Sequence, residues 1–198
     1  PYRRSGEGDY RCTYEEYQTM VRDAAIQSQD MRLIRGMGLN ALNSESIRNF
    51  RQRMKLYRPG HMWERLNDEA FLQKIGAVGE NDGSLHSTSA GLLMFGNRQD
   101  ILRAYPNYAM VYREQIDSEG HWTDTAWSGN VYEFYYWACN KLQQDVKTPV
   151  HQALREVLAN CLVNADYHGC GGIIVSKGHQ EITLSNPGSF RIPLDTAK

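Results

Sequence analysis

Two patterns are superposed in the stretch Arg155-Glu156-Val157-Leu158-Ala159-Asn160-Cys161-Leu162-Val163-Asn164-Ala165-Asp166-Tyr167. Its apolar side chains recur at helical spacing and predict a helix with one side packed against a core. On the neighbouring side, Glu156, Asn160 and Asn164 occupy every fourth position and stay in line at about 100° per residue. We name these three residues the polar row. Tyr167 falls in the same sector of the predicted helix.

The polar row has the chemistry of a site for a divalent cation and the phosphates that the cation bridges. Amide and carboxylate oxygens are hard donors, and Mg²⁺ usually takes only one or two protein groups beside water and phosphate oxygens. Glu156, one helical turn before Asn160, could instead polarise a water molecule. The alternative is an ordinary solvated helix face, on which Asn and Glu are common.

Beyond this helix, which Gly169 is placed to end, the sequence predicts a β-hairpin. Its strands are 173–176 and 181–185, joined by a turn at 177–180, and the second strand runs into Asn186-Pro187-Gly188. The predicted order is therefore polar-row helix, glycine loop, hairpin and Pro-Gly turn.

Another helix precedes it, starting at Asn130, and Pro149 separates the two helices. Asn130 and Glu133 have the spacing of a capping box. The predicted inner stripe of this helix is Val131, Tyr135, Ala138, Leu142 and Val146, and four more aromatic residues lie around it: Tyr132, Phe134, Tyr136 and Trp137. Such a cluster is typical of a core or an interface, and base stacking is the alternative. Upstream, a strand is predicted at 108–113 and a loop or hairpin tip at 117–129.

A further helix is predicted over 44–57, and its outer face is basic. Arg48, Arg51, Lys55 and Arg58 align on that face, where they could hold phosphates of DNA or RNA. No aromatic platform interleaves with them, and a charged outer face is also the default for a surface helix. Nucleic-acid contact and a solvated face are therefore both open.

Helix, hairpin and helix follow in order over 67–75, 77–86 and 89–96, an arrangement that could form a winged-helix-like unit. A DNA-reading helix directs several polar side chains toward base edges, whereas 89–96 is almost wholly apolar. We therefore interpret this region as scaffold. Near the N-terminus, Thr13 and Glu16 predict the start of another helix.

Length, composition and cysteine spacing limit the classes of function. With 41% hydrophobic residues, 23% charged residues and a net charge of −1, the 198-residue chain resembles soluble globular proteins and has no chain-wide attraction to nucleic acid or membranes. No apolar run approaches the roughly 18 residues of a membrane span. The four cysteines lie far apart without a secretory leader, so we expect a reducing, cytoplasmic setting. The six histidines show no metal-ligand spacing, and no Walker loop or nucleophile elbow occurs.

Two motifs carry a resemblance to a known family: Arg-Glu-x-Leu-x-Asn-x-Leu-Val-x-x-Asp-Tyr at 155–167 and Glu-Ile-x-Leu-Ser-Asn-Pro-Gly at 181–188. Together with the stretch 88–96, they resemble the bacterial transcriptional regulators described as RecG-like or Schlafen-related. In that family a Schlafen-AlbA-type nucleic-acid-binding domain precedes a divergent ATPase module similar to the GHKL group, which includes gyrase B, Hsp90, histidine kinases and MutL. The resemblance implies ATP and Mg²⁺ as cofactors, and DNA as a partner bound through a domain outside this chain.

The resemblance also implies roles for single residues. In the GHKL pattern a helix presents a catalytic acid and, four residues later, an Asn that binds Mg²⁺. Glu156 as base with Asn160 as metal ligand resembles the gyrase arrangement. Asn160 with Asn164 resembles the histidine-kinase arrangement, in which no carboxylate activates water. Both registers fit the sequence.

The second GHKL motif departs from the family pattern. An Asp should end the strand and accept the adenine amino group, with glycines after it, whereas this turn reads Ser185-Asn186-Pro187-Gly188. Ser185 or Asn186 would therefore make a weaker, uncharged contact, with Gly188 as the matching glycine. The family's glycine-rich ATP lid would lie past Lys198, so we expect a piece of a longer protein that binds nucleotide poorly by itself.

We therefore predict an α+β fold with two parts. Residues 1–100 form a mostly helical scaffold with a small β-hairpin, and residues 101–198 form a helix-on-sheet layer resembling a partial GHKL module. The predicted function is the ATP-responsive regulatory portion of a DNA-linked transcriptional regulator, with hydrolysis left open. The competing class is a non-catalytic interaction module with a decayed nucleotide pocket, in which the aromatic helix at 131–146 forms a homodimer.

Overall fold

The computed structural model describes residues 2–5, 8–14, 17, 20, 29–144 and 146–188. Its α-helices are α2 (Ser44–Tyr57), α3 (Asp68–Lys74), α4 (Ser89–Phe95), α5 (Arg98–Ala104), α6 (Val131–Gln143) and α7 (His151–Val163). Short 3-10 helices are η1 (Gln29–Met31), η2 (Leu39–Ala41), η3 (Met62–Arg65) and η4 (Thr148–Val150). The strands are β1 (Tyr2–Ser5), β2 (Gly8–Arg11), β3 (Val78–Asn81), β4 (Ser84–Ser87), β5 (Met110–Gln115), β6 (Trp122–Ala126), β7 (Ile173–Lys177) and β8 (Ile182–Ser185). This mixture confirms the predicted α+β class.

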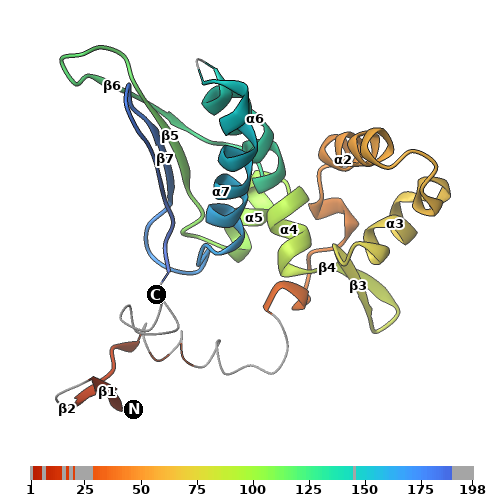
Figure 1. Cartoon of the computed structure of the whole chain (residues 1–198). Coiled ribbons are helices and arrows are strands. Elements are labelled where there is room, and N and C mark those ends of the chain that lie inside the picture. Colours follow the sequence, from red (N-terminus) through yellow and green to blue (C-terminus); the bar gives the residue numbers. More distant parts are fainter. Residues whose placement is uncertain are drawn as a thin grey trace.

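The largest sheet has the strand order β6-β5-β7-β8 (Figure 1). β5 pairs antiparallel with β6 and parallel with β7, and β7 pairs antiparallel with β8. Met110 and Ile173 begin the parallel pairing, and the chain between β5 and β7 contains β6, α6 and α7. A parallel pair requires such a crossover, so the two helices are held next to the sheet.

α6 and α7 cover one face of this sheet (Figure 1). Asn130 caps α6, because its Oδ1 accepts the N–H of Glu133 at 3.0 Å, as the capping-box spacing predicts. The core beneath the helices is made of large buried side chains from both layers: Phe134, Leu142, Leu158, Ile173 and Val175. Burial of this apolar surface fixes the helix layer against the sheet.

α2, α3 and the small hairpin form the other side of the molecule (Figure 1). The predicted helix over 44–57 is confirmed as α2, and the predicted cap Asn67 accepts the N–H of Ala70 at 2.9 Å at the start of α3. The hairpin is also confirmed, with β3 and β4 antiparallel and positive φ angles at Asp82 (51°) and Gly83 (73°) in its turn.

α4 is a packing element in the middle of the molecule. Leu92 and Phe95 are buried, and a methyl group added at Gly91 would lie 1.9 Å from the carbonyl oxygen of Ala77. The backbone of α4 therefore touches the chain that leads into β3, at a distance that only glycine permits.

The hydrophobic packing is continuous between the two parts that the sequence predicts. The core under α6 and α7 also takes Met37 and Leu92 from the N-terminal half. In the opposite direction, Tyr132 of α6 enters the core beneath α2, where Phe50 lies 5.3 Å from Phe95 and 5.7 Å from Tyr132 between ring centroids. α6 therefore contributes to both cores.

Two elements differ from the prediction. α5 is not predicted, because it is only 7 residues long and Asn97 gives it no side-chain cap. β6 lies in a segment predicted as loop or hairpin tip, and all five of its residues are exposed, so it lacks the alternating apolar pattern of a half-buried strand.

The predicted position of the end of the polar-row helix is also wrong. α7 ends at Val163, not near Gly169, and Asn164 is its C-cap with φ −94° and ψ 6°. The N–H of Asp166 then bonds to the carbonyl oxygen of Pro187 at 2.8 Å. This contact with a distant turn diverts the chain from the helix.

The predicted helix from Thr13 is only partly described. Tyr14, Tyr17 and Met20 are helical and the N–H of Tyr17 bonds to the Thr13 carbonyl oxygen at 3.0 Å, while Glu16 lies outside the described residues. Every helix in the described ranges is too short or too polar to cross a bilayer.

Candidate functional site

The polar row lies along α7 and its C-cap, and its three side chains are exposed. Glu156 and Asn160 are one turn apart within the helix, and Asn164 follows at its end. The two recesses described below are lined by other residues. The row is therefore an open polar surface that solvent and ligands can reach.

Hydrogen bonds distinguish the three residues. The Nδ2 of Asn164 donates to the carbonyl oxygen of Asn160 at 2.9 Å, and the main-chain N–H of Asn164 donates to the same oxygen at 3.1 Å. The Nε2 of Gln152 donates to Glu156 Oε1 at 3.0 Å. The side-chain amide of Asn160 makes no hydrogen bond with the described residues, so it is the member of the row that is free for a ligand.

The turn after β8 meets the end of α7, so the two motifs that suggest a nucleotide site lie side by side. The N–H of Asp166 donates to the carbonyl oxygen of Pro187 at 2.8 Å, and the Nδ2 of Asn186 donates to that of Asn164 at 3.2 Å. Gly188 has φ 144°, and a methyl group there would lie 3.7 Å from the Asn164 carbonyl oxygen. Asn186 and Gly188 are therefore next to the polar row.

Ser185 lies on the other face of the sheet. It pairs in register with Ile174, whereas the preceding pair, Val175 with Leu184, packs into the core under the helices. Successive residues of a strand point to opposite faces. Of the two residues predicted to contact adenine, the structure brings Asn186 to α7 and not Ser185.

Tyr167 does not extend the polar row, because it lies beyond α7. Its hydroxyl donates to the carbonyl oxygen of Leu162 at 2.8 Å, and its ring stacks on Tyr108 with centroids 5.9 Å apart. Burial raises the pKa of the Tyr167 hydroxyl, which therefore stays protonated at neutral pH. Tyr167 has a structural role at this end of the helix.

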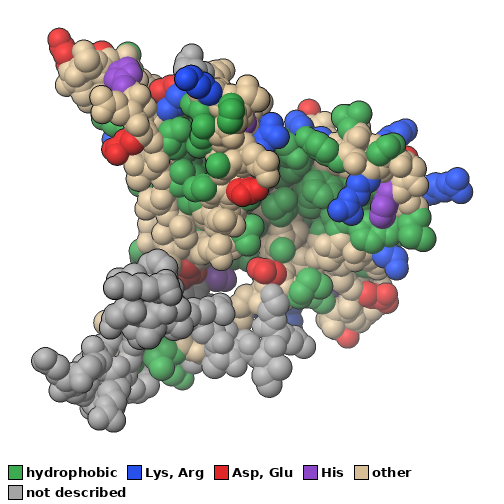
Figure 2. Space-filling view, viewed as in Figure 1, with side chains coloured by type: hydrophobic (Ala, Val, Ile, Leu, Met, Phe, Trp, Pro, Cys, Tyr) green, Lys and Arg blue, Asp and Glu red, His purple; other side chains and the backbone are tan. Residues whose placement is uncertain are grey.

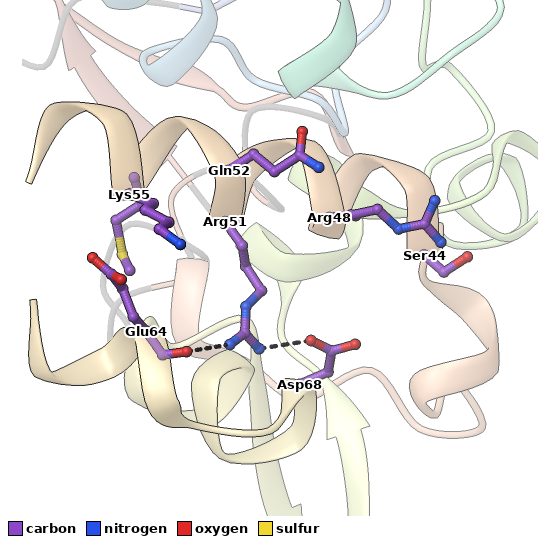
Figure 3. A pocket seen from close by; sticks show the side chains of 8 residues that line it. Ser44, Arg48, Arg51, Gln52, Lys55, Glu64 and Asp68 are labelled. Carbon is purple, nitrogen blue, oxygen red and sulfur yellow. Dashed lines mark hydrogen bonds and ion pairs between the residues drawn. The ribbon is translucent and has the colours of Figure 1, made fainter. Parts of the chain in front are cut away.

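The predicted basic face of α2 borders a recess of about 330 Å³ between α2, η3 and α3 (Figure 3). The charged residues in its lining are Arg48, Arg51, Lys55, Glu64 and Asp68. Arg48 and Lys55 are exposed and make no hydrogen bond or ion pair with the described residues. Several Lys and Arg side chains gather over this side of the molecule (Figure 2). Arg48 and Lys55, two of the four predicted nucleic-acid residues, thus line the same recess, and their cationic groups are free among the described residues.

Arg51 has a structural role. Its guanidinium bonds to Asp68 at 2.7 Å and to the carbonyl oxygen of Glu64 at 3.2 Å (Figure 3). It also bonds to the carbonyl oxygen of Leu66 at 2.5 Å. It also lies 4.7 Å from the centroid of the Phe71 ring. These contacts join α2 to η3 and α3, so the donors of Arg51 are occupied.

Arg58, the fourth predicted nucleic-acid residue, is exposed at the C-cap of α2 and does not line the recess. The exposed apolar side chains Leu56, Tyr57 and Met62 lie near it in the sequence. Arg58 therefore lies outside the recess that Arg48 and Lys55 line.

Residues 18–111 match the model of a domain of unknown function (DUF8451). No curated protein matches the chain. Among solved structures, the DIP2311 protein from Corynebacterium diphtheriae has a similar fold, with a TM-score of 0.61 and 16% sequence identity. The match covers 96% of this chain and 39% of that protein, so the chain spans about two fifths of its length. At this identity the likeness concerns the fold alone.

The aromatic residues of α6 pack mainly within the chain. Phe134 and Tyr132 are buried, and the Tyr136 ring lies under the guanidinium of Arg53 at 3.7 Å. Burial raises the pKa of Tyr135 to about 12. Trp137 meets Tyr112 edge to face, with centroids 5.2 Å apart. The core role predicted for this cluster is therefore confirmed, and self-association through it stays a prediction.

One group of ligand-type side chains was not found from the sequence. Asp117, Glu119 and His121, at the tip between β5 and β6, place one potential ligand atom each within 4.8 Å of one another. His121 Nδ1 lies 2.7 Å from Asp117 Oδ2, and this hydrogen bond lowers the pKa of the Asp117 carboxyl. The alternating Asp-x-Glu-x-His pattern is the signal that could have indicated it.

Proposed function

We propose that the polar row and the turn 186–188 bind the phosphates of a nucleotide together with Mg²⁺, and that the chain is the nucleotide-responsive portion of a DNA-linked regulator. The observation that carries this proposal is the contact between two distant motifs, made by the Asp166 to Pro187 hydrogen bond of 2.8 Å. The exposed side chain of Asn160 is one helical turn before Asn164, whose carbonyl oxygen is bonded to Asn186, and it offers a hard oxygen donor.

In this proposal Asn160 is the protein ligand of Mg²⁺, and the remaining positions are taken by water and phosphate oxygens. Asn164 has a supporting role, because its Nδ2 is already bonded to the Asn160 carbonyl oxygen. Because this bond occupies the Asn164 side chain, we favour the register in which Asn160 is the metal ligand and Glu156 precedes it by one turn. Glu156 is then the candidate base that would activate water for hydrolysis. Nucleotide binding does not depend on this role.

The open position of the row predicts weak binding by this chain. Water screens charges on an exposed surface, so each phosphate contact contributes little free energy. We therefore expect millimolar affinity, equivalent to about −4 kcal/mol. A segment that covers the bound nucleotide would exclude water and strengthen every contact.

The proposal is tested by titrating the isotopically labelled chain with Mg-ATP and following amide signals by NMR, which detects weak binding and locates it. We expect shifts confined to residues 160–166 and 185–188. Asn160→Ala should remove them, whereas the control Asn140→Ala, which changes an exposed Asn on α6, should not. Uniform or absent shifts would refute the nucleotide site. Absent shifts together with a dimer in sedimentation would favour the interaction module.

A second candidate function, contact with DNA or RNA phosphates, is favoured by the free cationic groups of Arg48 and Lys55 in the recess on α2. Each phosphate that a cation neutralises releases counterions and steepens the salt dependence of binding. Replacing both residues by Ala should therefore weaken binding to duplex DNA and reduce the slope against log salt by about 2. The charge-matched control replaces Arg35 and Lys147, both exposed. Equal effects of the two pairs would exclude a local site.

A further inference from the structure

A second recess, of about 450 Å³, lies between α6 and the strands β5 and β6, on the face of the sheet that carries the helices. β6 is an edge strand of the sheet, and its five residues are all exposed. Its lining comes from the three elements and the turn after β5: Tyr112, Glu114, Gln115, Ile116, Thr123, Thr125, Trp137 and Lys141. The volume is within the range of small-molecule sites, about 300–1,000 Å³.

Tyr112, one of the residues that line this recess, has an unsatisfied hydroxyl. The residue is 2% exposed, and its Oη is buried without a hydrogen-bond partner among the described residues. Leaving a buried donor unpaired costs free energy, and most such groups in folded proteins have partners. Burial raises the pKa of this hydroxyl, and the nearby Glu114 raises it further, so at neutral pH it remains a donor. A ligand with an acceptor atom would satisfy it.

The charged residues in the lining of the recess are Glu114 and Lys141. Glu114 is neutralised by Lys177 at 3.3 Å, and Lys177 also donates to the main-chain carbonyls of Lys141 and Gln144 at 3.2 and 3.1 Å. The ammonium group of Lys141 has no ion pair within the described part of the chain and lies 6.0 Å from the Trp137 ring centroid. One cation beside an aromatic ring is therefore left for a ligand.

We propose that this recess binds a small planar aromatic carboxylate. Its ring would lie against Trp137, and its carboxylate would accept from Lys141 Nζ and from the Tyr112 hydroxyl, with the Thr123 and Thr125 hydroxyls at the rim. A dianion such as a phosphate ester is disfavoured, because Lys141 is the one lining cation without an ion pair among the described residues.

This recess is separate from the proposed nucleotide site. The strand order β6-β5-β7-β8 puts two strands between β6, beside this recess, and β8, beside the polar row. Neither site shares a lining residue with the other. Failure of one therefore does not decide the other.

Naphthoate, with neutral naphthamide as its isostere, is a suitable probe for NMR titration of the whole chain. We expect naphthoate to shift the indole N–H signal of Trp137 and to bind about tenfold more tightly than naphthamide, which lacks the charge. Lys141→Gln should abolish that preference, whereas Lys147→Gln, at an exposed control lysine, should keep it.

Tyr112→Phe supplies an independent readout, because it removes the unpaired hydroxyl and nothing else. We expect this variant to melt at the same or a higher temperature than the original chain and to bind naphthoate several-fold more weakly. Naphthamide binding as tightly as naphthoate, an unchanged preference in Lys141→Gln, or an unmoved Trp137 signal would each overturn the proposal.

Discussion

The main-chain N–H of Asp166, just past the end of α7, donates a 2.8 Å hydrogen bond to the carbonyl oxygen of Pro187 in the turn after β8. This bond joins two segments about twenty residues apart that carry the two motifs of the proposed nucleotide site. It also explains why α7 ends where it does, because Asp166 cannot continue the helix while its N–H is held by the turn.

Gly188→Ala should weaken this junction. Gly188 has φ 144°, which side-chain-bearing residues rarely adopt, so alanine strains the turn by an amount on the order of 1 kcal/mol. Hydrogen exchange of the Asp166 amide should become faster, while exchange within β7 stays unchanged. Unaltered protection of Asp166 would show that the turn does not depend on this glycine.

Arg51→Ala should destabilise the fold, and Arg48→Ala should not. Arg51 supplies hydrogen bonds to two carbonyl oxygens and one carboxylate, whose loss costs about 1–3 kcal/mol. Arg48, on the same helix, has no such partner among the described residues, so its removal should stay within about 0.5 kcal/mol. Urea unfolding of both variants measures the difference. Equal stabilities would contradict the structural role of Arg51.

Ser46→Ala should loosen the contact between α2 and α6. The buried Ser46 hydroxyl donates to Glu133 Oε1 and accepts from Asn130 Nδ2 at 2.9 Å, so its loss removes two hydrogen bonds at a cost of about 1–3 kcal/mol, although Asn130 Nδ2 keeps a 3.4 Å bond to the Gly96 carbonyl oxygen. Ser44→Ala, at the exposed first residue of α2, is the matched control. Thermal unfolding should separate the two variants, and coincident curves would argue against a buried network.

His121→Ala should raise the pKa of Asp117. The His121 side chain is the main cause of the lowered pKa, followed by main-chain N–H donors that the substitution keeps. Because the folded-state pKa lies below the unfolded one, any stability from this pair is present above the unfolded pKa and lost as pH falls through the folded pKa. NMR titration of the Asp117 carboxyl measures the shift. An unchanged value would exclude His121 as its cause.

Local sequence signals were sufficient to predict much of the fold. Asn67 and Asn130 mark helix starts because capping depends on residues within one turn. β6 could not be found in this way, since an edge strand exposed on both faces has no apolar alternation. The end of α7 depends on Pro187, which is too distant in the sequence for a helix-stop rule to include.

The candidate site was predicted only in part. The spacing of Glu156, Asn160 and Asn164 places them on one side of a helix, but their exposure depends on what packs beside α7. The orientation of Ser185 follows from strand alternation with Leu184 and could have been predicted. The recess lined by Tyr112 could not be predicted, because it depends on how α6 lies relative to β6, and no local sequence pattern contains that information.

The central claim is that Asn160 holds a nucleotide-bound divalent cation, and it is tested most directly by replacing Mg²⁺ with paramagnetic Mn²⁺ in the presence of ATP. We predict that the side-chain amide signal of Asn160 broadens first, followed by the amides of Asn164 and Asn186, and that Asn160→Ala abolishes the effect. Broadening centred on Asp117 and His121 instead, or none beyond that of Mn²⁺ without ATP, would contradict the account.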